Sequence, residues 1–171
     1  VTSSKGIKDL SHPRVKTYPQ NQILDLKSKE KILHVPVNDE EEEIIGLFRS
    51  WTGSLHKYNI QISTGPVVAF RAANYIRDIY ENGTIFLVPL IWLHNVLKMR
   101  IEWPVNKPNK GQYIQICSQS QSVLVPNKNY ILLRRFSAKD DKSRLIASPY
   151  FAKKQDCDFV GIENKVNYIY R

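Results

Sequence analysis

Short apolar segments separated by turn-forming residues are the feature that most constrains the fold of this 171-residue chain. Over residues 59–171, such segments are rich in Ile, Val, Leu, Phe and Tyr, which is typical of β-strands. Gly65-Pro66 and Asn82-Gly83 are strong turn signals between them, and a short helical turn is expected at 74–80. The pattern predicts a mixed, β-rich α+β domain with few helices. The predicted strands are 59–63, 67–70, 84–92, 112–117, 122–125, 129–136, 145–151 and 159–170.

Residues 1–58 have a different pattern, which predicts a lead-in and junction segment with one helix. The first thirty residues are polar and irregular, and a short strand is expected at 32–37. Asn38 then precedes five consecutive acidic residues. Acidic side chains suit the first turn of a helix, because the N-terminus of a helix carries partial positive charge. We therefore expect a helix that begins after Asn38 and is closed by Gly53.

Positive charge is concentrated in the C-terminal part of the chain. Lys and Arg together number 25 against 16 Asp and Glu, which gives a net charge of +9 and a pI of about 9.5. Residues 107–171 hold 12 basic and five acidic side chains, a net charge of +7. A basic surface favours a polyanionic partner, because each neutralised phosphate releases counterions. Charge alone leaves a merely solvated basic face as the alternative.

Several classes of protein are disfavoured by the sequence. Cys117 and Cys157 have no further Cys or His at metal-ligand spacing, so we expect free thiols and no metal site. No apolar run reaches the length of a membrane span or resembles a signal peptide, which favours a cytoplasmic protein. Because the chain begins at Val1 and not at Met, we interpret it as a fragment of a longer protein.

The sequence lacks the motifs of the group-transfer reactions that act on DNA. An amino-methylating enzyme needs a Gly-rich loop for the methyl donor and an Asn/Asp-Pro-Pro-aromatic loop for the flipped base. Neither occurs, and Ser148-Pro149-Tyr150-Phe151 lacks the second proline and is interpreted as a strand. A nuclease is suggested only by Glu163-Asn164-Lys165, an acid-x-Lys unit downstream of Asp156 and Asp158. We therefore expect no catalytic, cofactor-binding or metal-binding residue here.

Basic side chains gather around the predicted strand 129–136. Arg134 and Arg135 are neighbours on it, so they point to opposite faces and at most one faces DNA directly. Ser137 followed by Asp140 resembles a capping box, which would place the next lysines on a short helical turn. The candidate DNA-binding residues of this cluster are Lys128, Arg134, Arg135, Lys139, Lys142 and Arg144.

Five ordered blocks between residues 60 and 170 resemble segments of type II restriction–modification adenine methyltransferases. They are 62–71 (ISTGPVVAFR), 89–91 (PLI) with 103–104 (WP), 125–137 (VPNKNYILLRRFS), 144–150 (RLIASPY) and 161–169 (GIENKVNYI). Together the blocks are similar to the TaqI-like C-terminal specificity, or target recognition, domain. The chain departs from the family pattern at Lys165, where His is expected.

The resemblance implies a parent enzyme with two lobes. A catalytic domain absent from this chain would bind S-adenosylmethionine and methylate the N6 amino group of adenine. This chain, without a cofactor of its own, would hold double-stranded DNA and select the sequence. Residues 1–58 show no resemblance to the family and are interpreted as the junction with the catalytic domain.

Further candidate residues come from particular side-chain chemistries. Thr64, beside Gly65, is placed to meet a phosphate, and Arg71 to read guanine or clamp a phosphate. Asn164 and Asn167 would either read adenine or join two loops. Base-reading side chains differ between relatives, so the middle of the chain supplies additional candidates: His94, Asn95, Lys98, Arg100, Gln112 and Gln115.

Two other functions remain open. One is a subunit-docking module that binds a methyltransferase or nuclease partner and touches DNA incidentally. The other is a metal-dependent nuclease, which would require Glu163 and a divalent metal.

Overall fold

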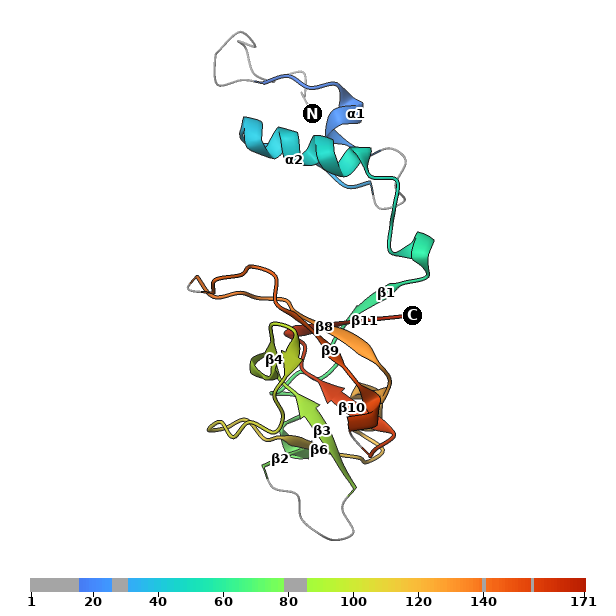
Figure 1. The fold of residues 1–171 in the computed structure, drawn as a ribbon, viewed down its shortest axis with the longest axis vertical. Helices are drawn as coiled ribbons and strands as arrows, with labels where there is room; N and C mark the ends of the chain where they lie inside the picture. The colour runs from blue at the N-terminus through green and yellow to red at the C-terminus, as the bar shows by residue number, and fades with distance from the viewer. Residues whose placement is uncertain (1–15, 26–30, 79–85, 140, 155) are drawn as a thin grey trace. The chain divides into compact units, whose positions relative to one another are not determined.

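The computed structural model describes residues 16–25, 31–78, 86–139, 141–154 and 156–171. The chain divides into two compact units, Val1–Ser54 and Leu55–Arg171. Helices are few and strands are many, so the predicted mixed, β-rich α+β fold is confirmed (Figure 1). Within the described ranges no helix is long and apolar enough to cross a membrane. Both cysteines are free.

The first unit contains α1 (Gln20–Ile23) and α2 (Asp39–Ser50). The predicted start of α2 is confirmed: the Asn38 side chain accepts a hydrogen bond of 2.8 Å from Glu41 N, and the first turn is acidic. The helix ends at Ser50, three residues before the predicted Gly53. Trp51 is extended at that end, so no left-handed glycine is needed to close the helix.

The strand predicted at 32–37 is wrong. Leu33 forms an isolated bridge with Leu24, and no ladder extends from it. Ile32, Leu33, Val35 and Val37 are all exposed. An alternating pattern forms a strand only where a neighbouring strand is available to pair with it.

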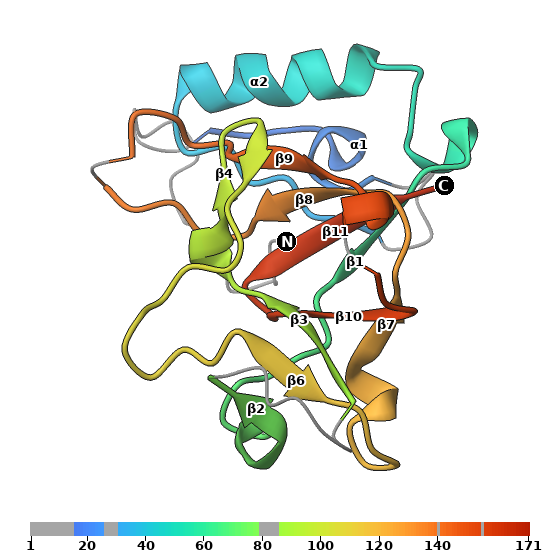
Figure 2. The same cartoon turned by 60° about the horizontal axis from the view of Figure 1, so that its bottom comes forward.

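Three sheets build the second unit, with strand orders β1-β11-β8-β9, β2-β6-β3-β10-β7 and β4-β5 (Figure 2). Between the strands that the structure describes, all ladders are antiparallel except that of β10 with β3. The strands are β1 (Gln61–Thr64), β2 (Ile76–Arg77), β3 (Leu87–Ile91), β4 (Val96–Leu97), β5 (Arg100–Ile101), β6 (Tyr113–Gln115), β7 (Leu124–Pro126), β8 (Tyr130–Arg134), β9 (Ala147–Tyr150), β10 (Phe159–Ile162) and β11 (Val166–Tyr170). Short 3-10 turns lie between them. One at Ala73–Tyr75 overlaps the predicted helical turn 74–80 only at its start, and the prediction is wrong at Ile76–Arg77, which form β2.

The core of this unit consists of two apolar clusters. One is shared by the four-stranded and five-stranded sheets and contains fully buried Leu132 and Val166 with the ring of Tyr130. The other is built on β3 and β6 and contains fully buried Leu90 and Ile114. All the buried hydrophobic side chains of the described residues belong to this unit.

The segment predicted as one strand at 159–170 is two strands. β10 and β11 are separated by a turn in which Val166 N donates to Glu163 O at 2.9 Å. Gly65 packs directly on this turn, since a Cβ there would lie 2.3 Å from the carbonyl oxygen of Glu163. The strand predicted at 67–70 is also wrong, because only Val67 forms a bridge. The Asn82-Gly83 turn lies outside the described residues.

Candidate nucleic-acid interface

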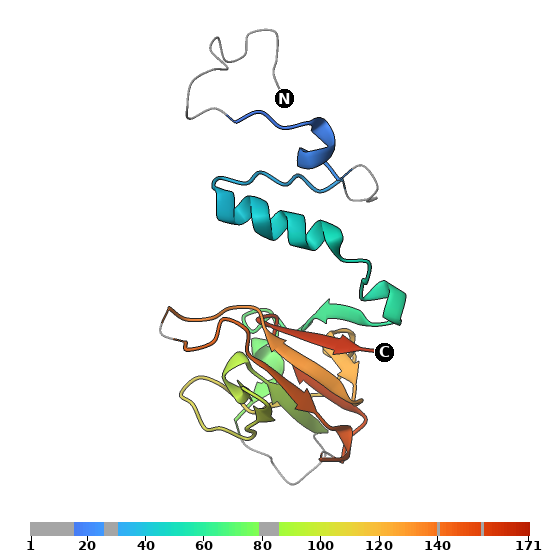
Figure 3. The ribbon, with the colours of Figure 1, turned by 45° about the horizontal axis from the view of Figure 1, so that its top comes forward.

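The segment 135–146 carries four of the predicted DNA-binding residues, Arg135, Lys139, Lys142 and Arg144, and projects from the end of β8 (Figure 3). Lys139, Lys142 and Arg144 are all exposed on it. Ala138 and Asp141 close a single turn, in which Ala138 N donates to Asp141 Oδ2 at 2.7 Å and Asp141 N to Ala138 O at 3.1 Å. The described part of this segment is not helical, so the predicted helical turn is wrong. Asp140 of the predicted capping box lies outside the described residues.

Arg134 and Arg135 have different environments. Arg134 is half-buried, and its Nε donates to the carbonyl oxygen of Val96 at 2.6 Å. Arg135 is exposed, and its guanidinium donates to the carbonyl oxygen of Asn164 at 2.8 Å. Arg135, which directly follows β8, is therefore the one of the two whose charge is more accessible to a polyanion.

Two of the predicted residues contact each other across β1 and β11. Thr64 lies opposite Asn167, and its hydroxyl donates to Asn167 Oδ1 at 3.1 Å. The backbone N–H of Gly65 donates to Val166 O at 2.8 Å, and that of Asn164 to Val67 O at 2.9 Å. These amide groups therefore stabilise the turn after β10.

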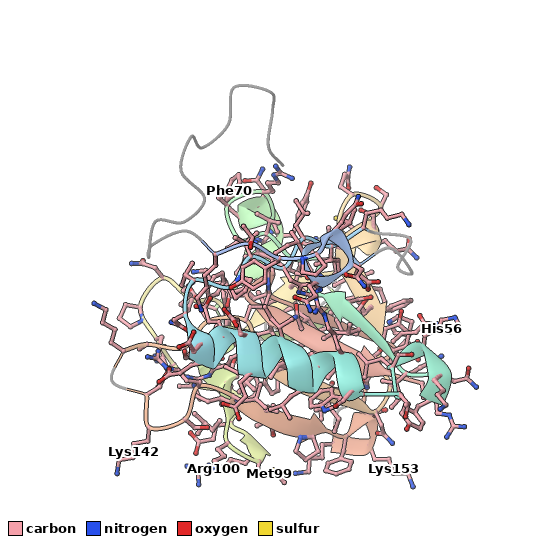
Figure 4. The ribbon with its side chains drawn as sticks, turned by 90° about the horizontal axis from the view of Figure 1, so that it is seen from above. His56, Phe70, Met99, Arg100, Lys142 and Lys153 are labelled. Atoms are coloured by element: carbon pink, nitrogen blue, oxygen red, sulfur yellow. The ribbon has the colours of Figure 1, made fainter. Side chains whose placement is uncertain are left out.

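Lys128 and Arg71 lie apart from this group. Lys128 is exposed and precedes β8, whereas the other basic residues follow its opposite end. Arg71 is exposed, with its guanidinium carbon 5.5 Å from the centre of the Phe70 ring. Figure 4 shows Phe70 and Lys142 at widely separated edges of the molecule. Among the residues that the structure describes, Arg71 forms no salt bridge, including with Asp78.

Glu163 is a buried carboxylate between two lysines. Its side chain is 4% exposed, and Oε2 accepts a hydrogen bond of 2.8 Å from Leu93 N. The ammonium groups of Lys110 and Lys165 each lie 3.9 Å from Oε1, too far for direct hydrogen bonds. Lys110 Nζ also lies 4.0 Å from the centre of the Trp92 ring, a favourable cation–π contact. The carboxylate thus lies within salt-bridge distance of two cations.

Glu163 and Lys165, the acid and the lysine of the acid-x-Lys unit, therefore make structural contacts in this fold. Asp156 and Asp158 are exposed, whereas Glu163 is buried against the backbone of Leu93. In the described ranges, no group of three or more His, Cys, Asp or Glu side chains is arranged to hold a metal ion.

His94 lies in the same basic neighbourhood. Its Nε2 is buried without a hydrogen-bond partner, and its ring stacks on Trp92 at 6.5 Å between centres. Burial, followed by the positive charges of Lys107, Lys110 and Arg134, lowers the pKa of His94 to about 4. The imidazole is therefore neutral at physiological pH.

The additional candidates from the middle of the chain separate into structural and exposed groups. Asn95 and Gln112 are buried and hydrogen-bonded to backbone groups, and Gln115 accepts from Arg77 at 2.8 Å. Lys98 and Arg100 are instead exposed at the β4–β5 hairpin. No sequence pattern predicted this hairpin, because each of its strands has two residues.

Comparison with known proteins shows that the chain is similar to type II methyltransferases. It is 31% identical over 170 residues to the type II methyltransferase M.PstI of Providencia stuartii, an alignment that covers 99% of this chain and 33% of the relative. It is 32% identical over 155 residues to the type II methyltransferase M.BsuBI of Bacillus subtilis, covering 90% of this chain and 30% of the relative.

The chain thus spans about a third of the length of these two relatives. The alignment with M.PstI includes nearly all of residues 1–58, so the expectation that this segment shows no resemblance to such proteins is wrong. No family model matches the chain. No solved structure matches it either.

Proposed function

We propose that this chain is the DNA-recognition part of a type II, adenine-specific N6 DNA methyltransferase of a restriction–modification system. The observation that carries the proposal is the similarity of nearly the whole chain to one third of M.PstI. The sequence blocks at 62–71, 125–137 and 161–169 support the more specific assignment to a TaqI-like target recognition domain. In the parent enzyme, a separate catalytic domain would bind S-adenosylmethionine and transfer the methyl group.

The distribution of charge supports separate domains for methyl transfer and for DNA binding. An enzyme that methylates a base must extrude it from the duplex, and another surface must hold the remaining DNA. Exposed cations lie on the segment 135–146 and on the β4–β5 hairpin, where long side chains reach phosphates without a fixed base register. Arg135 adds an accessible guanidinium at the end of β8.

Binding of a fluorescent duplex of mixed sequence, followed by anisotropy over a range of salt concentrations, tests the proposal. If about four to six phosphates are neutralised, the affinity falls roughly as the fourth or fifth power of salt concentration. A subunit-docking module predicts no measurable duplex binding, or binding that is insensitive to salt. Either of those results would contradict a DNA-recognition role.

The cofactor assignment has its own test. The sequence contains neither a Gly-rich donor loop nor a Pro-Pro-aromatic loop, so we expect no heat of binding when the chain is titrated with S-adenosylmethionine. A stoichiometric complex of micromolar affinity in isothermal calorimetry would show that this chain, and not another domain, holds the donor.

A further inference from the structure

The β4–β5 hairpin has an unusual residue at its tip. Leu97 pairs with Arg100, which leaves Lys98 and Met99 as a two-residue turn. Met99 is in the left-handed region with φ of 65°, a conformation that is unfavourable for an ordinary side chain. Its side chain is nevertheless 71% exposed, and it is the only methionine of the chain. The turn therefore presents a large apolar group to solvent at a cost in backbone energy.

The base of the hairpin is held firmly. Asn95 is fully buried; its Oδ1 accepts from Trp92 N at 2.7 Å and its Nδ2 donates to Glu102 O at 2.7 Å. Arg134 binds the carbonyl oxygen of Val96, and Met99 N donates to Ala147 O at 2.8 Å on β9. An unfavourable backbone conformation persists where surrounding contacts over-determine it, and such positions cluster at functional sites.

Positive charges surround the exposed apolar tip. Lys98 precedes Met99, and Arg100 follows it. Met99 and Arg100 also line an open groove of about 490 Å³ together with exposed Phe151 and Lys154. Glu102, the acid beside the tip, forms a 2.6 Å salt bridge with Arg100. In Figure 4, Met99, Arg100 and Lys153 lie along the same edge of the molecule. A cationic rim of this kind favours a polyanionic partner over an apolar protein surface.

We propose that the hairpin is a wedge that inserts Met99 between stacked base pairs of duplex DNA, while Lys98 and Arg100 hold the flanking phosphates. The inference rests on the proposed DNA-recognition function and specifies the element that deforms the duplex. Apolar side chains such as Met can enter a base step, unstack it and kink the helix, because the inserted surface replaces base stacking. Lys98 and Arg100 would neutralise the negative charge of the phosphates that come closer together in the kink.

The test compares an intact duplex with the same duplex carrying one central abasic site, in which the cost of unstacking is already removed. We expect the full chain to bind the abasic duplex about fivefold or more tightly, and Met99→Ala to lose that preference. Met99→Leu keeps an apolar wedge and should restore it. Phe86→Ala is the matched control, because Phe86 is 76% exposed and lies at the opposite end of β3 from the segment that leads into the hairpin.

A second readout uses the single methionine. In a chain labelled at the methionine methyl carbon, ring currents of the bases should shift the Met99 NMR signal when duplex is added. An unmoved signal with saturating duplex, or an abasic preference unchanged in Met99→Ala, would overturn the wedge. Salt-dependent binding of the intact duplex would in that case still support the proposed function. Absence of binding to both duplexes would overturn both proposals.

Discussion

Glu163 illustrates how one residue can have a different role from the one that its local sequence suggests. In the sequence it begins an acid-x-Lys unit like those of metal-dependent nucleases. In the fold it accepts a hydrogen bond from Leu93 N and lies between the ammonium groups of Lys110 and Lys165. Sequence spacing did not predict these contacts, because Lys110 and Leu93 are more than fifty residues away along the chain.

Removing this carboxylate should destabilise the fold. Glu163→Ala leaves the N–H of Leu93 unsatisfied and two lysines without their shared acid, so we expect a loss of about 2–3 kcal/mol in the free energy of unfolding. Glu163→Gln keeps an oxygen acceptor and should cost less. Urea denaturation measures both, with Glu102→Ala as an exposed control that should cost at most about 1 kcal/mol. Equal stability of Glu163→Ala and the unmodified chain would contradict the structural role.

The depressed pKa of His94 predicts a stability that decreases on acidification. The unfolded chain takes up a proton at its ordinary pKa near 6.5, whereas the folded chain resists protonation until about pH 4. The free energy of unfolding should therefore fall as the pH is lowered from about 6.5 to 4. His94→Gln should show a weaker pH dependence in this window, measured by denaturant midpoints. An NMR titration that gives His94 an ordinary pKa would refute the prediction.

At the scale of elements, the longer strands were predicted because their apolar alternation covers a whole segment. β3, β8, β9 and β11 all lie within predicted strands. Apolar alternation predicted a strand wrongly at 32–37, where no neighbouring strand pairs with the segment. It could not predict β4 and β5, because a strand of two residues is too short to show an alternating pattern. The division of 159–170 was missed because the turn at Glu163–Lys165 contains no Gly or Pro.

The segment 135–146 should act as a phosphate-tracking element. Lys139→Ala and Lys142→Ala should each weaken binding to all duplex sequences alike and lower the salt slope by about one, because each lysine contacts a phosphate without reading a base. Arg171→Ala removes the same charge from the far end of β11 and serves as the control. Anisotropy at several salt concentrations measures the slopes. Slopes unchanged in both lysine variants would exclude this segment from the interface.

Charge indicated where basic side chains gather along the chain, but not which of these side chains are accessible. The cations of 135–146 are exposed, whereas Arg134 is half-buried. The hydrogen bond from Arg134 to the carbonyl oxygen of Val96 depends on packing between β8 and the β4–β5 hairpin, and no local sequence pattern predicts this packing. The same holds for Met99, whose exposure and backbone conformation follow from the position of a turn that sequence did not predict.

At the scale of the whole molecule, the second unit contains the buried core. We expect the fragment 55–171 to unfold cooperatively with a melting temperature within a few degrees of that of the full chain, since no buried apolar side chain among the described residues lies in the first unit. Thermal denaturation followed by circular dichroism, with limited proteolysis, tests this. A fragment that is unfolded, or that melts without cooperativity, would show that the first unit is required for the fold.

The positions of β10 and β11 have a consequence for biosynthesis. Both come later in the sequence than the strands they pair with, yet each is an interior strand, β10 between β3 and β7 and β11 between β1 and β8. The N-terminal part of a chain leaves the ribosome first, so neither sheet can be completed until residues 159–170 have left the exit tunnel. Until then, the edges of four earlier strands lack these partners and are exposed to aggregation and to chaperones. Folding of the second unit is therefore expected to be completed only after residues 159–170 have been synthesised, as its long-range strand pairing also favours.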